Sequence, residues 1–543
     1  MWGKQQMAVF EGRLYNSHMT GRRGWIAAGL LGLAVAGCTL LPYLLAERAV
    51  TLPDAFAGFL LNPLDGFSYL AKMRQGADGS WLFTLPYGLE PGPGAFLFVY
   101  HLLLGHLARW LTLPLLTVYH SARILGAVAM YLAGWGFFSV VLRNRRARWA
   151  AFALTLVGSG IGWLLLPLGI VSPDLWVPEA IPFLSAYTNA HFALATAALL
   201  CGVVAVAVCV LQRRAAVHWL AIAGLCGLAL GAIQPFAALC ALMILSAWLL
   251  WEAGLALRRS RAGLQSLRPG LAALSALALG SMPWAAYDWW ITRTDPALAA
   301  WSSQNLTPSP PPLEFAAAYG IVLLLAIANL VRSHPARHPT DRLLVAWVVV
   351  NALLLYAPFG LQRRLALGLF FPLAALAART VVGLAGGRLH LRGVLAIALV
   401  VSIPSNLVVV GAGLTGVQRS DPTLILSAGE AGAYRWLAEK AEAEAVVLAS
   451  PFSGARLPAF ANVRVLVGHP FETPQATEQR RLVEDLYAWD GDPETGVGQL
   501  VSLGIDYVLF GEPESQLGDP AWLPLLTPTY AQADTRLFRV ADP

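Results

Sequence analysis

The chain has few charged residues for its length. Only 13% of its 543 residues are Asp, Glu, Lys or Arg, whereas 57% are hydrophobic. Soluble domains carry about 25% charged residues, so this composition excludes an ordinary soluble protein. The formal net charge of +6 does not indicate nucleic-acid binding, because the arginines occur in short clusters between apolar runs, as membrane topology requires.

Cysteine is scarce as well, and all five cysteines lie inside apolar runs: Cys38, Cys201, Cys209, Cys226 and Cys240. They therefore provide neither a disulfide framework nor the ligand spacing of a zinc site. A small-residue cleavage site is also missing after the first apolar run, where Pro42 and further apolar residues follow. We interpret that run as a membrane anchor rather than a removed signal peptide.

Apolar runs of about 20 residues recur along the chain and predict a mainly α-helical, polytopic membrane protein. Arg22 and Arg23 precede the first run and place residues 1–24 in the cytoplasm. With alternating crossings, the later arginine clusters between the remaining runs also fall on the cytoplasmic side. We predict about eleven transmembrane helices, at residues 25–45, 117–142, 149–171, 188–211, 217–233, 235–257, 270–290, 313–331, 343–357, 365–382 and 394–414. These helices make up a transmembrane domain of residues 25–414. Because the number is odd, the C-terminal part is expected on the extracytoplasmic side.

Residues 47–116 form a long first extracytoplasmic loop in this topology. The apolar run at 95–111 carries His101, Gly105 and Arg109 on one helical stripe, which favours an interfacial helix over a spanning one. A crossing at this point would also place the arginine cluster at 143–148 outside the cell, against the positive-inside rule. The loop is therefore expected to contain interfacial helices.

Residues 415–543 form the predicted extracytoplasmic domain, and from about Ser427 helical and strand patterns alternate. Helices are predicted at 430–440 and 477–488, and buried strands at 445–450, 464–468 and 506–510. This alternation predicts a small α/β domain with a partly parallel sheet. It carries no glycine-rich phosphate-binding loop.

The stretch from Asn62 to Arg74 is the first candidate site. It places Asp65, Tyr69, Lys72 and Arg74 just outside the membrane. One interpretation is a helix N-terminus, because Pro63 can start a helix and an acid in the first turn favours the helix dipole. The other is a functional site, in which Lys72 or Arg74 keeps Asp65 ionised.

Further polar residues are predicted at the same membrane boundary. Glu90 lies in a segment rich in proline and glycine, Glu179 lies in the second outer loop, and His191 follows shortly after it. Arg363 and Arg364 form a basic cluster on the outer side, against the positive-inside rule. They are either snorkelling anchors at a helix end or a clamp for a lipid phosphate, because guanidinium groups match phosphate oxygens.

With these residues in place, the layout over residues 25–414 resembles that of the GT-C-type membrane glycosyltransferases, which include oligosaccharyltransferases, protein O-mannosyltransferases and aminoarabinose transferases. The resemblance implies transfer of a sugar from a polyprenyl-phosphate carrier outside the membrane. It implies that Asp65 takes the place of the first-loop acid, which acts as a base or helps to hold a divalent metal. Glu179 matches a further acid, and Arg363 and Arg364 match the carrier-phosphate site.

We therefore predict a membrane glycosyltransferase that transfers a sugar to an acceptor on the extracytoplasmic side. Asp65 and Glu179 are the expected catalytic residues and the expected ligands of a divalent cation such as Mg²⁺ or Mn²⁺. The expected partners are a polyprenyl-phosphate-linked sugar, a glycan, lipid or protein acceptor, and membrane lipid, without nucleic acid. The expected location is the plasma (inner) membrane. The residues expected to bind substrate are Arg363, Arg364, Lys72, Tyr69, Glu90 and His191.

Two alternatives remain open at this point. A transporter or flippase of a lipid-linked substrate needs ionisable groups near the middle of the bilayer and broken helices. The sequence has such groups only sparsely and gathers its acids at one boundary, which favours an enzyme. A catalytically inactive scaffold is the second alternative, because Asp65 is a single acid followed by Gly66, whereas the family often has paired acids there.

Overall fold

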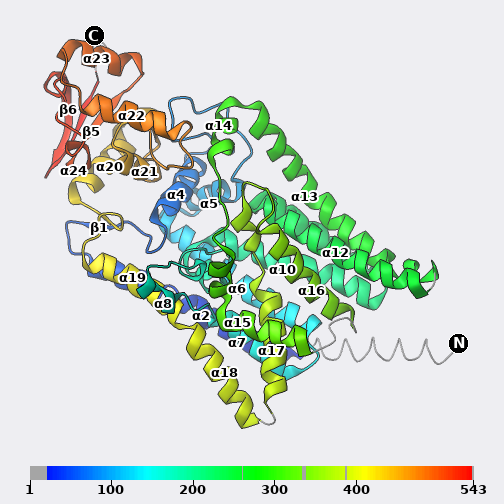
Figure 1. The fold of residues 1–543 in the computed structure, drawn as a ribbon. Helices are drawn as coiled ribbons and strands as arrows, with labels where there is room; N and C mark the ends of the chain where they lie inside the picture. Colours follow the sequence, from blue (N-terminus) through cyan, green and yellow to red (C-terminus); the bar gives the residue numbers. More distant parts are fainter. Residues whose placement is uncertain (1–20, 260, 333–337, 386–387, 541–543) are drawn as a thin grey trace. The chain divides into compact units, whose positions relative to one another are not determined.

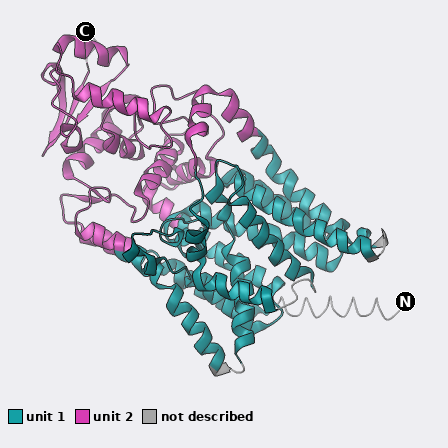
Figure 2. Cartoon of the chain, viewed as in Figure 1, with its two compact units in different colours: residues 1–41, 122–286, 307–411 teal, residues 42–121, 287–306, 412–543 magenta. Residues whose placement is uncertain are grey.

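The computed structural model describes residues 21–259, 261–332, 338–385 and 388–540 (Figure 1). The chain divides into two compact units, coloured separately in Figure 2. Unit 1 comprises Met1–Leu41, Ala122–Ala286 and Thr307–Gly411, and unit 2 comprises Pro42–Ser121, Tyr287–Leu306 and Ala412–Pro543. Residues 1–20 of the predicted cytoplasmic N-terminus lie outside the described residues.

Unit 1 consists of apolar helices that pack against one another. Helix α10 packs on α11, α15 on α17, and α12 on α16. A buried ion pair joins the last two, because Arg342 Nε lies 2.6 Å from Glu252 Oε1. The helices of unit 1 are α2 (Arg22–Cys38), α7 (Arg145–Val157), α8 (Gly162–Leu165), α9 (Pro182–Thr188), α10 (Ala190–Gln212), α11 (Val217–Ile233), α12 (Pro235–Arg259), α15 (Pro312–Arg332), α16 (Pro339–Leu354), α17 (Phe370–Leu384) and α18 (Arg388–Ser402). Four further helices contribute residues to both units: α3 (Leu41–Ala49), α6 (Leu115–Val141), α13 (Arg268–Thr294) and α19 (Pro404–Gln418).

The predicted membrane-spanning segments overlap helices, with breaks such as residues 158–161 within the predicted span 149–171, and their number is not confirmed. Within the described residues, eight helices are long and apolar enough to cross a membrane. A ninth span results if α7 and α8, which are bent by 46°, cross together. Helices α11 and α16 have only 17 and 16 residues, which is short for a hydrocarbon core that needs about 20.

In unit 2, the first-loop residues form two closely crossing helices, α4 (Pro63–Ala77) and α5 (Val99–Leu111). A Cβ atom on Gly76 would lie 2.1 Å from the Leu102 carbonyl oxygen, and one on Gly105 would lie 1.9 Å from the Met73 carbonyl oxygen. Only glycine permits this approach. The stripe of α5 that contains His101 and Gly105 is therefore buried, whereas exposed apolar side chains form the other face: Leu103, Leu107, Trp110 and Leu111. Such a face is typical of a helix lying at a membrane interface.

The C-terminal part of unit 2 is a five-stranded sheet with helices, which confirms the predicted small α/β domain. Its strand order is β4-β3-β5-β7-β6, in which β3 pairs in parallel with β4 and β5, and β7 pairs antiparallel with β5 and β6. The strands are β3 (Ala445–Leu448), β4 (Val463–Val465), β5 (Tyr507–Phe510), β6 (Thr527–Gln532) and β7 (Thr535–Arg539). The main helices are α20 (Ala428–Lys440), α21 (Pro451–Phe460), α22 (Ala476–Tyr487) and α23 (Pro493–Ser502).

First-loop and C-terminal residues of unit 2 are joined by backbone pairing. Strand β1 (Ala55–Phe56) pairs with β2 (Ile425–Leu426), and Tyr87 bridges to Val465 at the end of β4. Helix α21 also packs against α4. The loop that follows β4 is thereby held beside α4, although hundreds of residues separate the two in the sequence.

Candidate active site

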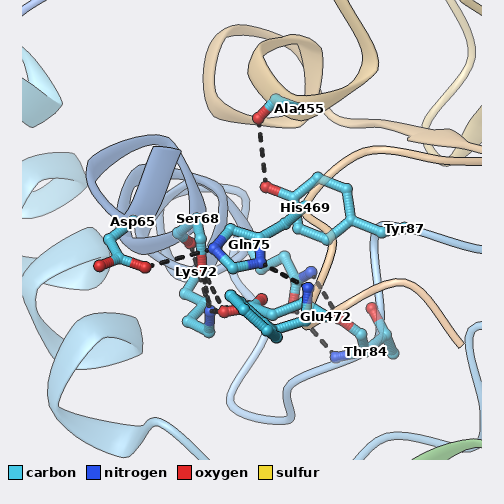
Figure 3. A network of polar contacts seen from close by, with 10 residues as sticks. Asp65, Ser68, Lys72, Gln75, Thr84, Tyr87, Ala455, His469 and Glu472 are labelled. Atoms are coloured by element: carbon cyan, nitrogen blue, oxygen red, sulfur yellow. Dashed lines mark hydrogen bonds and ion pairs between the residues drawn. The ribbon is translucent and has the colours of Figure 1, made fainter. Parts of the chain in front are cut away.

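Helix α4 presents three polar side chains toward the C-terminal residues of unit 2. Its start is fixed locally, because Asn62 adopts a left-handed φ of 50° and Pro63 occupies the first turn. Asp65, Ser68 and Lys72 are spaced by three and four residues, so they share one face of the helix. Figure 3 shows this face meeting His469 and Glu472 from the loop after β4.

Asp65 is paired with a buried histidine. His469 Nε2 lies 3.2 Å from Asp65 Oδ1, and the His469 side chain is only 4% exposed. The backbone N–H of Phe471 donates to His469 Nδ1 at 3.2 Å. The Nδ1 atom is thus an acceptor, which assigns the ring proton to Nε2 in the neutral imidazole. His469 therefore donates to Asp65 and orients its carboxylate, which is 44% exposed.

Lys72 forms a buried ion pair with Glu472. Lys72 Nζ donates to Glu472 Oε1 and Oε2 at 2.9 and 2.8 Å, and its side chain is 1% exposed. Ser68 Oγ donates to Glu472 Oε1 at 2.6 Å. Burial is the largest single effect on Glu472 and raises its pKa, but Lys72, His469 and Ser68 together outweigh it, so the net pKa is lowered. Glu472 therefore stays ionised and anchors the loop that carries His469.

Tyr87 closes the far side of this network (Figure 3). It is fully buried, and its Oη donates to the Ala455 carbonyl oxygen at 3.4 Å. Burial raises the pKa of Tyr87 well above its usual value, and the negative charges of Glu472 and Asp65 raise it further. The phenol therefore remains neutral and serves as a packed hydrogen-bond donor.

The remaining predicted residues of unit 2 have different surroundings. The Tyr69 ring stacks on His101 with a centroid distance of 4.9 Å, so this ring packs α4 against α5. Glu90 is exposed in the segment between α4 and α5. Arg74, suggested by the sequence as a partner of Asp65, is attracted instead by Asp78 one turn further along.

Glu179, His191, Arg363 and Arg364 belong to unit 1. Glu179 and His191 are buried, each 6% exposed. Arg363 and Arg364 lie in a short 3₁₀ helix, η4 (Gln362–Ala366), where each guanidinium lies over an aromatic ring, that of Trp176 at 4.8 Å and that of Phe236 at 5.6 Å. Their convergence with Asp65 stays a prediction.

Arg363 lies in a group of polar atoms that lack hydrogen-bond partners. Its backbone N–H donates to the Thr307 carbonyl oxygen at 3.1 Å, which holds residues 307–309 alongside η4. Buried Arg363 Nε, Thr307 Oγ1 and Ser309 Oγ have no hydrogen-bond partner. Buried polar atoms without partners are costly, so these three atoms could each contact a bound polar group.

The described residues do not form a metal centre by themselves. Among them, no group of three or more His, Cys, Asp or Glu side chains is arranged to hold a metal ion. Mg²⁺ is commonly bound by one or two carboxylates together with substrate phosphates and water. The Asp65 carboxylate would therefore hold a divalent cation only together with ligands from a substrate.

His469 and Glu472 were not predicted as site residues from the sequence, although their positions in the sequence indicate a possible functional role. His469 follows the predicted strand 464–468 directly and Glu472 comes three residues later, and functional side chains of parallel sheets lie at the carboxyl ends of strands. The sequence gives no indication that these two residues meet α4, because they lie 404 and 400 positions from Asp65 and Lys72.

The fold is that of the GT-C membrane glycosyltransferases, as predicted. The Archaeoglobus fulgidus oligosaccharyltransferase AglB, solved with an inhibitory peptide and a dolichol-phosphate, is 12% identical with a TM-score of 0.50, and the match covers 92% of this chain and 69% of that one. ArnT from Cupriavidus metallidurans, bound to undecaprenyl phosphate, is 13% identical with a TM-score of 0.51 and coverages of 94% and 97%. The mycobacterial arabinofuranosyltransferase AftD is 15% identical with a TM-score of 0.50, and the match covers 96% of this chain and 40% of that one.

Sequence comparisons add one family. Residues 363–541 match a family described as "Family of unknown function (DUF6541)", which spans less than half of the chain. No curated protein sequence matches the chain. The similarity to known enzymes is therefore one of fold.

Proposed function

We propose that this protein is a membrane glycosyltransferase that transfers a sugar from a polyprenyl-phosphate carrier to an acceptor on the extracytoplasmic side, with Asp65 as the general base. The observation that carries the proposal is the hydrogen bond from His469 to Asp65 within a GT-C fold. It orients a carboxylate whose side chain is 44% exposed. The lipid phosphates bound to AglB and ArnT support a carrier of the same chemical class.

The proposed reaction assigns a role to each group. The acceptor hydroxyl hydrogen-bonds to Asp65, which takes its proton as the acceptor oxygen forms a bond to the anomeric carbon of the sugar. The bond between that carbon and the carrier phosphate breaks, and the phosphate leaves with the electron pair. Arg363 and Arg364 stabilise the charge that grows on the leaving phosphate. Glu179 and His191 position the acceptor.

A divalent cation supplies charge neutralisation at the carrier phosphate when one is bound. The AglB enzyme has also been solved with Zn and sulfate. In this chain Asp65 and Glu179 are the proposed carboxylate ligands, with the phosphate of the carrier completing the set.

The test is the substitution Asp65→Asn, which keeps the shape of the side chain and removes its basicity. Purified protein is incubated with a polyprenyl-phosphate-linked sugar and a membrane extract as the acceptor source, and released polyprenyl phosphate is measured. We expect release to fall about 100-fold or more, because a positioned general base contributes about 10²- to 10⁴-fold. Full activity of Asp65→Asn would refute the role as base.

The matched control is Asp78→Asn. Asp78 is an exposed acid at the end of the same helix and is expected to leave transfer unchanged. Movement of the intact sugar-linked carrier across liposomes, without release of polyprenyl phosphate, would instead support the transporter alternative.

A further inference from the structure

A cavity in unit 2 is large enough for a small-molecule ligand. Its volume is about 590 Å³, within the range of about 300–1,000 Å³ that ligand pockets occupy. Apolar rings and proline form most of its wall: Pro63, Leu64, Phe67, Pro451, Phe452 and Pro470. Four small or aliphatic residues also line it, Ala455, Val467, Gly468 and Ala476, and four lining side chains carry polar groups: Thr423, Arg456, Thr477 and Arg480.

Three helices begin at this cavity. Pro63 is the first residue of α4, Pro451 is the first residue of α21, and Ala476 is the first residue of α22, and all three line the cavity. The first turns of a helix carry unpaired N–H groups and a partial positive charge. Helices α21 and α22 also follow the parallel strands β3 and β4, and the carboxyl ends of parallel strands are where ligands bind in such sheets. The start of a helix favours a bound anion, so these three helix starts are consistent with an anionic ligand in the cavity.

Arg456 is the independent observation that points to a ligand. Its side chain is 1% exposed, its guanidinium lies 4.1 Å from the Phe452 ring centroid, and Nη1 donates to Glu430 Oε1 at 3.1 Å. The buried Nη2 atom has no hydrogen-bond partner. A buried guanidinium that has a hydrogen-bond partner for Nη1 but none for Nη2 is costly. An anionic group in the cavity would accept a hydrogen bond from Nη2.

None of the described residues that line the cavity is acidic. Glu430 pairs with Arg456 Nη1, and burial raises the pKa of Glu430 above its usual value although Arg456 lowers it. Arg480 is 62% exposed and pairs with Glu484 at 3.3 Å on the surface of α22. Glu478, in the first turn of α22, does not line the cavity.

The cavity adjoins the Asp65–His469 pair. Pro63, Leu64 and Phe67 line it and surround Asp65 in the sequence of α4. Gly468 and Pro470 line it on either side of His469. Asp65 and His469 do not themselves line the cavity, so an acceptor held here would have to extend beyond it to reach the proposed base.

We propose that this cavity binds an anionic acceptor, in which a phosphate, sulfate or carboxylate group is attached to a partly apolar body, and that Arg456 and Arg480 recognise the anion. The proposal rests on the proposed function, because it identifies the substrate class that Asp65 deprotonates. The apolar walls contact the body of the acceptor, and its hydroxyl extends beyond the cavity to the Asp65 carboxylate.

The test measures binding of phenyl phosphate, an anion on an apolar ring, to the purified full-length protein by isothermal titration calorimetry. We expect saturable binding of phenyl phosphate and benzoate, and none of the neutral phenyl β-glucoside. Arg480→Gln should weaken binding about threefold to tenfold, because it removes one charge at the rim. Thr477→Trp, which fills the mouth, should abolish binding.

The matched control is Arg481→Gln, which removes the adjacent, exposed charge of the same helix outside the cavity and should leave binding unchanged. Equal weakening by Arg480→Gln and Arg481→Gln, or unchanged binding in Thr477→Trp, would overturn the proposal. Thr477, Arg480 and Arg481 are all exposed, so the three variants are expected to fold.

A second measurement separates this inference from the proposed function. Asp65→Asn should bind phenyl phosphate as the unmodified protein does, because Asp65 does not line the cavity. Full transfer activity in Asp65→Asn with intact phenyl phosphate binding would refute the general-base role of Asp65 but still support the anion-binding cavity. Loss of activity in Asp65→Asn without phenyl phosphate binding to either protein would support the base and overturn the anion site.

Discussion

Lys72 and Glu472 are 400 residues apart in the sequence, yet the ammonium of one donates to both carboxylate oxygens of the other at 2.9 and 2.8 Å. The pair joins the first-loop helix α4 to the loop that carries His469. It therefore holds the partner of Asp65 in place, although neither residue has been assigned a chemical step. The integrity of the proposed site depends on this contact.

Breaking the pair is predicted to destabilise unit 2. We expect Lys72→Met and Glu472→Gln each to cost about 3–5 kcal/mol, because each leaves a buried group without its partner. The double variant Lys72→Met/Glu472→Gln should cost less than the sum of the single changes. Chemical unfolding in mild detergent measures these differences.

The control for this pair is the exposed pair of Arg480 and Glu484, whose side chains are 62% and 46% exposed. Replacing both with Gln should change the unfolding free energy by less than about 0.5 kcal/mol. Strictly additive costs for Lys72 and Glu472 would contradict the proposed coupling.

Glu472 also predicts a pH dependence of stability. Its pKa in the folded protein lies below the usual 4.5, so the folded state favours the ionised carboxylate. The resulting stabilisation is fully present above the unfolded pKa and is lost as the pH falls through the lower, folded pKa. Thermal unfolding over this acidic range should show a smaller loss of stability in Glu472→Gln, and an identical slope in both proteins would contradict the prediction.

Local signals predicted the start of α4 and the strands of the C-terminal domain. Pro63 and Asp65 together are a typical helix start, and the buried strands around Val447 and Val508 are continuous apolar runs bounded by turns. These features depend on neighbours within a few residues, so the sequence contains the information for them.

Long-range pairing could not be predicted in the same way. The stripe of α5 with His101 and Gly105 identified an amphipathic helix, but only the structure shows that this stripe packs on α4 through Gly76. Similarly, nothing near Asp65 in the sequence indicates that its partner is His469. Such contacts depend on loop closure over hundreds of residues, for which a single sequence carries no local pattern.

His469 is predicted to act as a positioning residue through Asp65. His469→Phe removes the Nε2–H donor and should lower kcat about 10- to 100-fold, the effect expected for a hydrogen bond to a charged group. KM should stay unchanged, because His469 is 3% exposed and does not contact substrate in the proposed mechanism. His469→Gln, which retains a donor near the same place, should restore part of kcat.

A purely structural role of His469 would give a different result. It would lower the amount of folded protein in both variants equally, without the selective recovery by Gln. The amount of folded protein is measured by near-ultraviolet circular dichroism before each assay.

Metal binding is predicted to depend on the carrier. Asp65 and Glu179 are the proposed carboxylate ligands, and Mg²⁺ and similar cations are commonly bound by one or two carboxylates together with substrate phosphates. Addition of polyprenyl phosphate should therefore tighten Mn²⁺ binding. Electron paramagnetic resonance of free Mn²⁺ measures binding with and without the carrier, and equal affinity in both states would contradict this assignment.

Arg363 is predicted to bind the carrier phosphate. Its partnerless Nε, next to Thr307 Oγ1 and Ser309 Oγ, is the observation behind this prediction. Arg363→Gln should raise the KM for the polyprenyl-phosphate sugar about 10- to 100-fold, in line with the loss of a charge-assisted contact. Arg363→Lys should recover only part of this, because an ammonium cannot reproduce the guanidinium fork.

Inhibition by free polyprenyl phosphate distinguishes this role from that of a membrane anchor. If Arg363 holds the phosphate, the inhibition constant should rise in Arg363→Gln by about the same factor as KM. The control Arg419→Gln, at an exposed position directly after α19, should leave both unchanged. A snorkelling anchor would instead reduce stability in the membrane and leave the inhibition constant as it is, because its contacts are with the bilayer rather than with the carrier phosphate.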